Sequence, residues 1–150
     1  MAEGLNPDRP KKLSIVVFSG EFDKVHYALV MASAAAATDS AVTLFFTMEG
    51  ARAMLGPDAD GQPAWAKQPT SAGFDNGGQM DITFKNRQVA DFETLLGACK
   101  ELGVRFMVCE MGLKALGLDR NDLRSDILFD IGGVVTFLND ANKDGSALFI

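Results

Sequence analysis

Short apolar runs rich in β-branched residues alternate with segments of helical period, and this alternation is what most constrains the fold. Residues 13–18 (Leu-Ser-Ile-Val-Val-Phe) and 42–47 (Val-Thr-Leu-Phe-Phe-Thr) have the length and composition of strands buried on both faces of a parallel sheet. Between them, apolar residues recur at helical spacing over residues 22–37. The order strand, helix, strand predicts parallel strands joined by right-handed helical crossovers.

The same alternation continues to the end of the chain. Further helices are predicted over residues 49–55, 91–102, 111–116, 121–129 and 135–141. Further strands are predicted over residues 104–108 and 147–150, with 132–135 either a short strand or a turn. We therefore expect an α/β fold, a three-layer α/β/α sandwich around a mostly parallel sheet of about five strands. A single domain over residues 12–150 would follow a flexible lead-in over residues 1–11.

Residues 57–86 break this pattern. They contain three prolines and several glycines, and no period of either kind is sustained. We expect a long loop here, which is uncommon in a compact domain unless it is functional or mobile. It is either a flap over a site, with an apolar underside supplied by Trp65, Phe74, Met80 and Phe84, or a solvent-exposed insertion.

Composition excludes several classes of protein. With a net charge of -6 and only one short basic cluster, Arg9 to Lys12, the chain lacks the basic face of a nucleic-acid binder. The longest apolar region, residues 27–37, is too short for a stable membrane insertion. Two cysteines and an amino terminus without the pattern of a signal peptide favour a reducing, cytoplasmic location.

Neither a metal nor a nucleotide cofactor is expected. One histidine and two separated cysteines do not make a Cys/His zinc site. The turn over residues 19–24, Ser-Gly-Glu-Phe-Asp-Lys, matches neither of the glycine-rich phosphate-binding motifs, and its acidic residues would repel a phosphate.

Cys109 is the candidate catalytic residue, because it stands where a predicted strand gives way to a predicted helix. In open α/β sheets, ligands gather at the carboxyl ends of the strands. The first turn of a helix there also favours thiolate over thiol. The thiol is therefore either a nucleophile or sulfur carrier, or a small buried hydrophobic residue, and its neighbour Glu110 would oppose ionisation if the carboxylate lay close.

The other chemically active side chains have structural interpretations. Cys99 falls on the apolar face of the helix predicted over 91–102, which indicates core packing, and its spacing from Cys109 matches no CxxC redox motif. His26 lies in the first predicted helix and is expected to be a structural histidine rather than a catalytic one. Glu21, Asp23 and Glu49 follow strands, where helix capping is the expected role of Asp23.

Three groups of residues together resemble the DsrE/DsrF-like family. They are residues 19–24 opening an alanine-rich helix, residues 45–50 (Phe-Phe-Thr-Met-Glu-Gly), and Gly103-Val104 leading to residues 109–113 (Cys-Glu-Met-Gly-Leu). The resemblance runs from about residue 12 to the end and is strongest to a subgroup often labelled as peroxiredoxin-like. It implies a DsrE-like fold, homo- or hetero-oligomers, and a persulfide-carrying cysteine at Cys109. It also implies rhodanese-like sulfur donors and TusA-like sulfur carriers as partners.

These observations give a first hypothesis and two alternatives. The first is a sulfur carrier or sulfurtransferase of a sulfur-relay pathway, with persulfide on Cys109. The second is a non-catalytic oligomeric module that binds a ligand or partner, in which Cys109 is buried and unreactive. A thiol peroxidase ranks last, because Phe106-Met107-Val108 stands where Pro and Thr would precede a peroxidatic cysteine.

Overall fold

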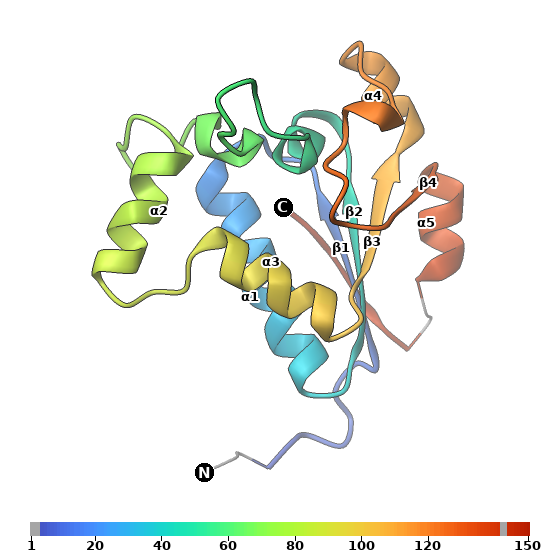
Figure 1. Cartoon of the computed structure of the whole chain (residues 1–150). Coiled ribbons are helices and arrows are strands. Elements are labelled where there is room, and N and C mark those ends of the chain that lie inside the picture. Colours follow the sequence, from blue (N-terminus) through green and yellow to red (C-terminus); the bar gives the residue numbers. More distant parts are fainter. Residues whose placement is uncertain (1–3, 142–143) are drawn as a thin grey trace.

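The computed structural model describes residues 4–141 and 144–150 and forms a five-stranded, wholly parallel sheet (Figure 1). Its strand order is β4-β3-β2-β1-β5. The strands are β1 (Lys12–Val17), β2 (Ala41–Phe46), β3 (Arg105–Cys109), β4 (Phe129–Gly132) and β5 (Ser146–Phe149). The parallel α/β fold expected from the sequence is thus confirmed.

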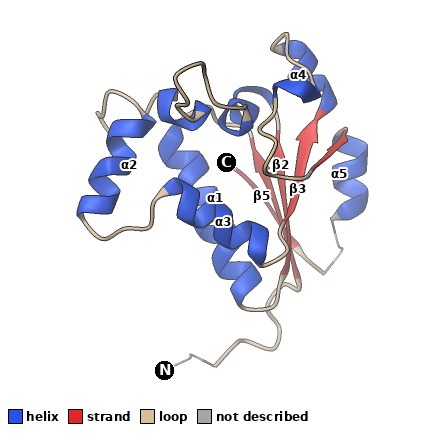
Figure 2. Ribbon diagram, in the orientation of Figure 1, coloured by secondary structure: helices blue, strands red, loops and turns tan. Residues whose placement is uncertain are grey.

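Helices cover the two faces of the sheet unequally (Figure 2). α1 and α3 pack side by side on one face, and α5 covers the other. The helices are α1 (Phe22–Ala37), α2 (Gly77–Asn86), α3 (Phe92–Glu101), α4 (Glu110–Ala115) and α5 (Val134–Asp140), with 3₁₀ helices η1 (Met48–Met54), η2 (Ala64–Lys67) and η3 (Arg120–Asp122). The sheet is therefore thickly covered on one side and thinly on the other.

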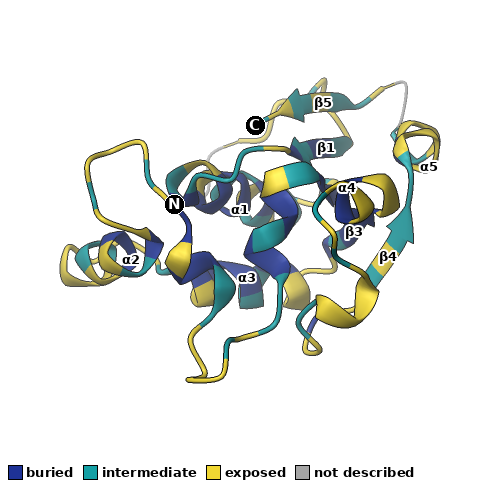
Figure 3. Cartoon of the chain, turned by 90° about the horizontal axis from the view of Figure 1, so that it is seen from above, coloured by how far each residue is buried: buried dark blue, intermediate teal, exposed yellow. Residues whose placement is uncertain are grey.

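Strand alternation divides the core into two clusters, because successive side chains point to opposite faces. In β2, Val42, Leu44 and Phe46 join the large cluster under α1 and α3. Phe45 joins a small cluster under α5, together with Met107, Cys109 and Phe137. Figure 3 shows the buried residues concentrated in the sheet, α1 and α3, whereas the outer surfaces of α2 and α5 are exposed.

Residues 57–86 are not the continuous loop that the sequence predicts, because η2 and α2 lie within them. Asn76 caps α2 by accepting a hydrogen bond from the Gln79 N–H. The expected apolar underside is present. Trp65 packs on Phe22 and Phe92, with ring centroids 5.5 and 4.7 Å away, on the α1 and α3 side of the sheet.

The prediction of a helix over residues 121–129 is also wrong. An Asp119–Asp122 capping box closes a single 3₁₀ turn, η3. The backbone then bonds to the segment after η1, through Gly56 N to Asp122 O (2.8 Å) and Arg124 N to Met54 O (2.9 Å). These bonds to a segment distant in the sequence replace the bonds that a helix would make within itself.

The lead-in expected over residues 1–11 is described from residue 4 onward, and residues 1–3 lie outside the described residues. Arg9 donates a hydrogen bond to Ser40 Oγ (2.6 Å) and another to the carbonyl of Thr38. The segment therefore lies against the turn before β2. Among residues 4–141 and 144–150, no helix combines the length and apolar character needed to cross a bilayer.

Candidate functional site

Cys109 is the last residue of β3, at the carboxyl edge of the sheet, as the sequence predicts. It pairs in register with Gly132 of β4 and follows Met107 on the face covered by α5. Because all strands are parallel, the loops after β1, β2 and β4 leave the sheet at this same edge (Figure 2). The thiol thus occupies the position where open α/β proteins gather ligands.

The Cys109 sulfur caps the helix that follows it. Gly112 N–H donates a hydrogen bond to Cys109 Sγ, at an N to S distance of 3.4 Å. A side chain at position 112 is excluded, since a Cβ there would lie 2.7 Å from Met48 N and 2.8 Å from Thr47 Oγ1. The close approach of Gly112 to the loop after β2 therefore positions the donor beside the thiol.

The thiol is closed off from solvent in this structure. Its exposed fraction is 0%. Phe137 of α5 stacks on Phe45 of β2 in the same cluster, with ring centroids 4.8 Å apart. Phe137 of α5 therefore belongs to the cluster that contains Cys109. Residues 57–86, for which we expected either a flap over a site or a solvent-exposed insertion, pack on the opposite side of the sheet.

α5 is tethered at its C-terminal end. The Asp140 carboxylate accepts hydrogen bonds from Thr43 Oγ1 (2.6 Å) and Arg105 Nη1 (2.6 Å). It also pairs with Lys12 Nζ at 3.0 Å. The other end of the helix follows Gly132-Gly133, directly beside Cys109 in the sheet.

Glu110 does not face into the thiol cluster. Its side chain is exposed and lies 3.7 Å from Lys114 Nζ, one helical turn away. The charge of Glu110 is therefore solvated and paired with Lys114. The direct polar contact of the Cys109 sulfur is instead the Gly112 amide.

Cys99 is a core residue, as the sequence indicates. It is fully buried in the large cluster, and Cys99 Sγ lies 3.7 Å from the carbonyl oxygen of Leu29. Burial raises the pKa of the Cys99 thiol to about 12. Both cysteines are free, on opposite faces of the sheet, and Cys99 is held as an unreactive thiol.

His26 is likewise structural. It is buried in α1, donates from Nε2 to the carbonyl of Ala90 (2.8 Å), and packs against Phe84 with ring centroids 4.7 Å apart. α1 covers the face opposite to Cys109, so the two side chains do not meet. No cluster of three or more His, Cys, Asp or Glu side chains that could hold a metal occurs in the described part of the chain.

The acidic residues after the strands have local partners. Glu21 pairs with Lys24, and Glu49 with Arg52. Asp23 does not cap α1, contrary to expectation, because its carboxylate accepts hydrogen bonds from the N–H and hydroxyl of Ser71. Partial burial opposes ionisation of Asp23, but these hydrogen bonds outweigh it and hold its pKa below the usual value. Asp23 therefore anchors the loop before α2.

The sequence analysis missed one feature of this edge. A cavity of about 330 Å³ lies beside the loops after β1 and β2, and Gln68 lines it. The Gln68 side chain is buried without a partner for its amide. A single glutamine in a loop has no pattern that could have identified it from sequence.

Comparison with known proteins decides the family. A model of the DsrE/DsrF/DrsH-like family matches residues 9–61 and 66–149. The chain belongs to this family. It is 32% identical over 161 residues to the uncharacterized protein YrkE of Bacillus subtilis, covering 95% of this chain and 99% of YrkE.

A solved structure supports the fold of this DsrE/DsrF/DrsH-like protein. The protein of unknown function MTH1491 from Methanobacterium thermoautotrophicum superposes with a TM-score of 0.56, over 93% of this chain and 98% of that one. The two sequences are 12% identical, so the likeness concerns the fold alone. Family membership and fold are thus shown by independent comparisons.

Proposed function

We propose that this protein is a sulfur carrier or sulfurtransferase of a sulfur-relay pathway, with Cys109 as the carrying residue. The Cys109 thiolate attacks the outer sulfur of a donor persulfide, R–S–SH, and a new S–S bond forms as the old one breaks. The products are Cys109–S–SH and the donor thiolate, R–S⁻, so no external oxidant or reductant is needed. Transfer to an acceptor thiolate repeats the exchange in the opposite sense.

The observation that carries this proposal is the placement of Cys109. Its thiol is free at the carboxyl end of a central strand, and the Gly112 amide nitrogen lies 3.4 Å from its sulfur. Cys99 has neither this position nor such a contact, and burial raises its pKa. The resemblance that implies persulfide on Cys109 is to the family to which the chain belongs.

Burial of Cys109 adds a requirement to this proposal. A donor reaches the sulfur only if the N-terminal end of α5 moves away, since Phe137 closes the cluster. The cluster is small, and the Gly132-Gly133 pair precedes α5, so local opening of this helix is the motion that the proposal needs. Closure of α5 between transfers would protect the persulfide from exchange with other thiols in solution.

The proposed partners are proteins, because sulfur passes from thiol to thiol by direct exchange. A rhodanese-like donor and a TusA-like acceptor fit this chemistry, and a reducing cytoplasm keeps Cys109 as a thiol between transfers. We also propose that the protein forms homo-oligomers.

The decisive experiment is mass spectrometry of the intact protein after incubation with a rhodanese and thiosulfate, or with a cysteine desulfurase and cysteine. We expect one added sulfur atom on the wild type and on Cys99→Ser, and none on Cys109→Ser. Peptide mapping then locates the sulfur. Sulfur on Cys99 instead, or on neither cysteine with either donor, contradicts the proposal.

A second candidate function is a non-catalytic oligomeric module of the same fold that binds a ligand or partner. The complete burial of Cys109 favours it, because a buried thiol packs as a small apolar residue. It predicts that no donor loads sulfur on Cys109 and that Cys109→Ser leaves partner binding unchanged.

A further inference from the structure

Gln68 is an unusual residue of the carboxyl edge. Its exposed fraction is 5%, yet neither Oε1 nor Nε2 of its side chain has a hydrogen-bond partner within the protein. Among buried side-chain nitrogen and oxygen atoms of the described residues, the hydroxyl of Ser14 alone shares this state. Buried polar groups are normally paired, so an amide left open requires an explanation.

The main chain holds Gln68 in place. Its N–H donates to the carbonyl of Trp65 (3.2 Å), and its carbonyl accepts from Gly77 N (2.8 Å). Trp65 is itself fixed, because its indole N–H donates to Glu93 Oε2 at 2.7 Å. The unpaired amide therefore sits on a rigid support.

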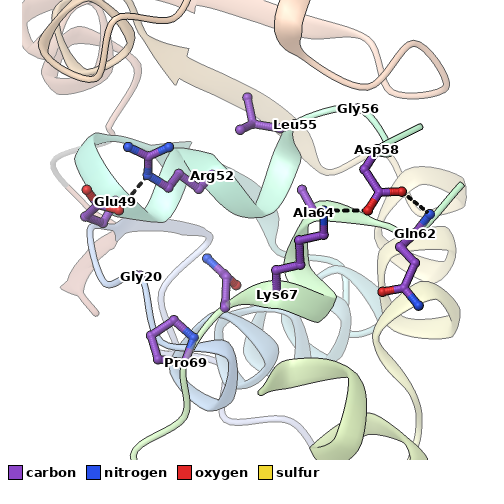
Figure 4. Close-up of a pocket in the computed structure, with 11 residues that line it drawn as sticks. Gly20, Glu49, Arg52, Leu55, Gly56, Asp58, Gln62, Ala64, Lys67 and Pro69 are labelled. Atoms are coloured by element: carbon purple, nitrogen blue, oxygen red, sulfur yellow. Dashed lines mark hydrogen bonds and ion pairs between the residues drawn. The ribbon is translucent and has the colours of Figure 1, made fainter. Parts of the chain in front are cut away.

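This amide lines the cavity of about 330 Å³ (Figure 4). Gly20 after β1, Leu55 after η1 and Pro69 after η2 form much of its wall, as the close-up shows. The volume is at the lower end of the range for small-molecule sites, about 300–1,000 Å³. A cavity with mostly apolar walls and one unpaired polar group is the general form of such a site.

The charged residues of the cavity neutralise one another. Arg52 Nε pairs with Glu49 at 2.7 Å, and Lys67 pairs with Asp58. Two positive and two negative side chains leave no excess charge, so the lining does not select a strongly charged ligand. Recognition falls to the Gln68 amide, which offers one donor group beside one acceptor.

We propose that this cavity binds a small, uncharged planar molecule whose edge carries a hydrogen-bond donor beside an acceptor. A carboxamide and an aminopurine edge share this chemistry, and a glutamine amide can pair with either through two hydrogen bonds. The apolar walls would contact the faces of the planar group. Cys109 is not among the lining residues, so this site stands apart from the proposed sulfur chemistry.

The test uses the ¹⁵N-labelled full chain and two probes, nicotinamide and adenine. Each is compared with an analogue that lacks the donor, N,N-dimethylnicotinamide and purine. Fragments of this size bind with dissociation constants of about 1–10 mM. We expect both probes, or one of them, to shift the side-chain NH₂ resonances of Gln68 and the amide of Gly20, and the donor-free analogue to bind about tenfold more weakly.

A variant pair gives an independent readout. Gln68→Met keeps the size of the side chain and removes the amide, and we expect about a tenfold loss of probe affinity. Gln62→Met makes the same change at an exposed residue of the cavity and is expected to bind as the wild type does. The proposal is overturned if neither probe shifts Gln68, or if the donor-free analogue or Gln68→Met binds equally well. The comparison of probe with analogue needs no variant and does not depend on sulfur loading of Cys109.

Discussion

Cys109 and Gly112 form one structural unit at the end of β3. The Gly112 amide reaches the sulfur because the absence of a side chain lets α4 approach the loop after β2. Thr47 and Met48 leave no room for a Cβ there. The glycine therefore allows both the close packing of α4 and the contact between its amide and the Cys109 sulfur.

Substitution of this glycine tests the close approach. We expect Gly112→Ala to lower the free energy of unfolding by about 1–3 kcal/mol, because the added methyl group forces the backbone of α4 away from Thr47. Urea denaturation followed by circular dichroism measures the change.

Gly97→Ala is the matched control. It lies inside α3, where a Cβ would meet nothing within 4 Å. The same change should raise stability there by about 0.5–1 kcal/mol, since alanine loses less backbone entropy on folding. Equal effects at the two positions would contradict the packing argument at Gly112.

α5 is the element on which access to the site depends. Its Phe137 packs in the cluster that contains Cys109, and its Asp140 binds three side chains of the sheet. One end is fixed by charge and hydrogen bonds, and the other by one stacked ring. The Gly133 end of α5 is thus the more weakly attached end, and we expect the helix to open from there.

Truncation of the stacked ring tests this mode. We expect Phe137→Ala to raise the rate at which iodoacetamide alkylates Cys109 by at least about tenfold, because loss of a buried aromatic contact shifts the local opening equilibrium. Peptide mass spectrometry measures the rate at each cysteine. Asn139→Ala, at an exposed position of the same helix, should react as the wild type does.

Cys99 provides the internal reference for this measurement. If Phe137→Ala accelerates labelling of both cysteines equally, the fold has opened globally and the local argument fails. Selective acceleration at Cys109 would support it.

Helices and strands with a regular hydrophobic period could be predicted from the sequence, and those without one could not. β1, α1, β2, α3 and β3 follow their hydrophobic periods closely. α2 could not be predicted because Gly77, Gly78 and several polar residues obscure the helical period of its apolar residues. In the structure, Asn76 caps its first turn. The helix predicted over 121–129 fails because bonds to the segment after η1 outcompete local propensity.

The position of the candidate site in the fold could be predicted from the sequence, but the solvent exposure of Cys109 could not. Cys109 lies at the strand end that the sequence indicates, while its burial depends on α5 folding back over the sheet from distant residues. The Gln68 cavity combines loops after β1, η1 and η2, and tertiary contacts of this kind leave no local pattern.

At the scale of the whole molecule, apolar side chains gather on the thinly covered face of the sheet. Val135 and Leu138 of α5 are 72% and 61% exposed, and Phe149 of β5 is 70% exposed. Phe149 pairs in register with Val16, which packs on the cluster beneath α5. A group of exposed apolar side chains on one face is typical of an association surface.

The proposed self-association can be tested by charge insertion on this face. We expect the wild type to elute as an oligomer in size-exclusion chromatography with light scattering, and Val135→Asp with Leu138→Asp to shift it towards the monomer. Ile82→Asp, which alters an equally exposed apolar residue on α2, should leave the assembly unchanged. A monomeric wild type, or equal disruption by Ile82→Asp, would argue against this surface.

Asp140 makes the attachment of α5 independent of acidity inside a cell. Partial burial disfavours its charged form, but hydrogen bonds from Thr43 and Lys12 and the pairing with Arg105 outweigh burial and hold the pKa of Asp140 below its usual value. A carboxyl group with a depressed pKa contributes its full stability above its unfolded pKa of about 3.9, and loses it only as the pH falls through the folded value. Protonation of Asp140 would therefore not release α5 near neutral pH.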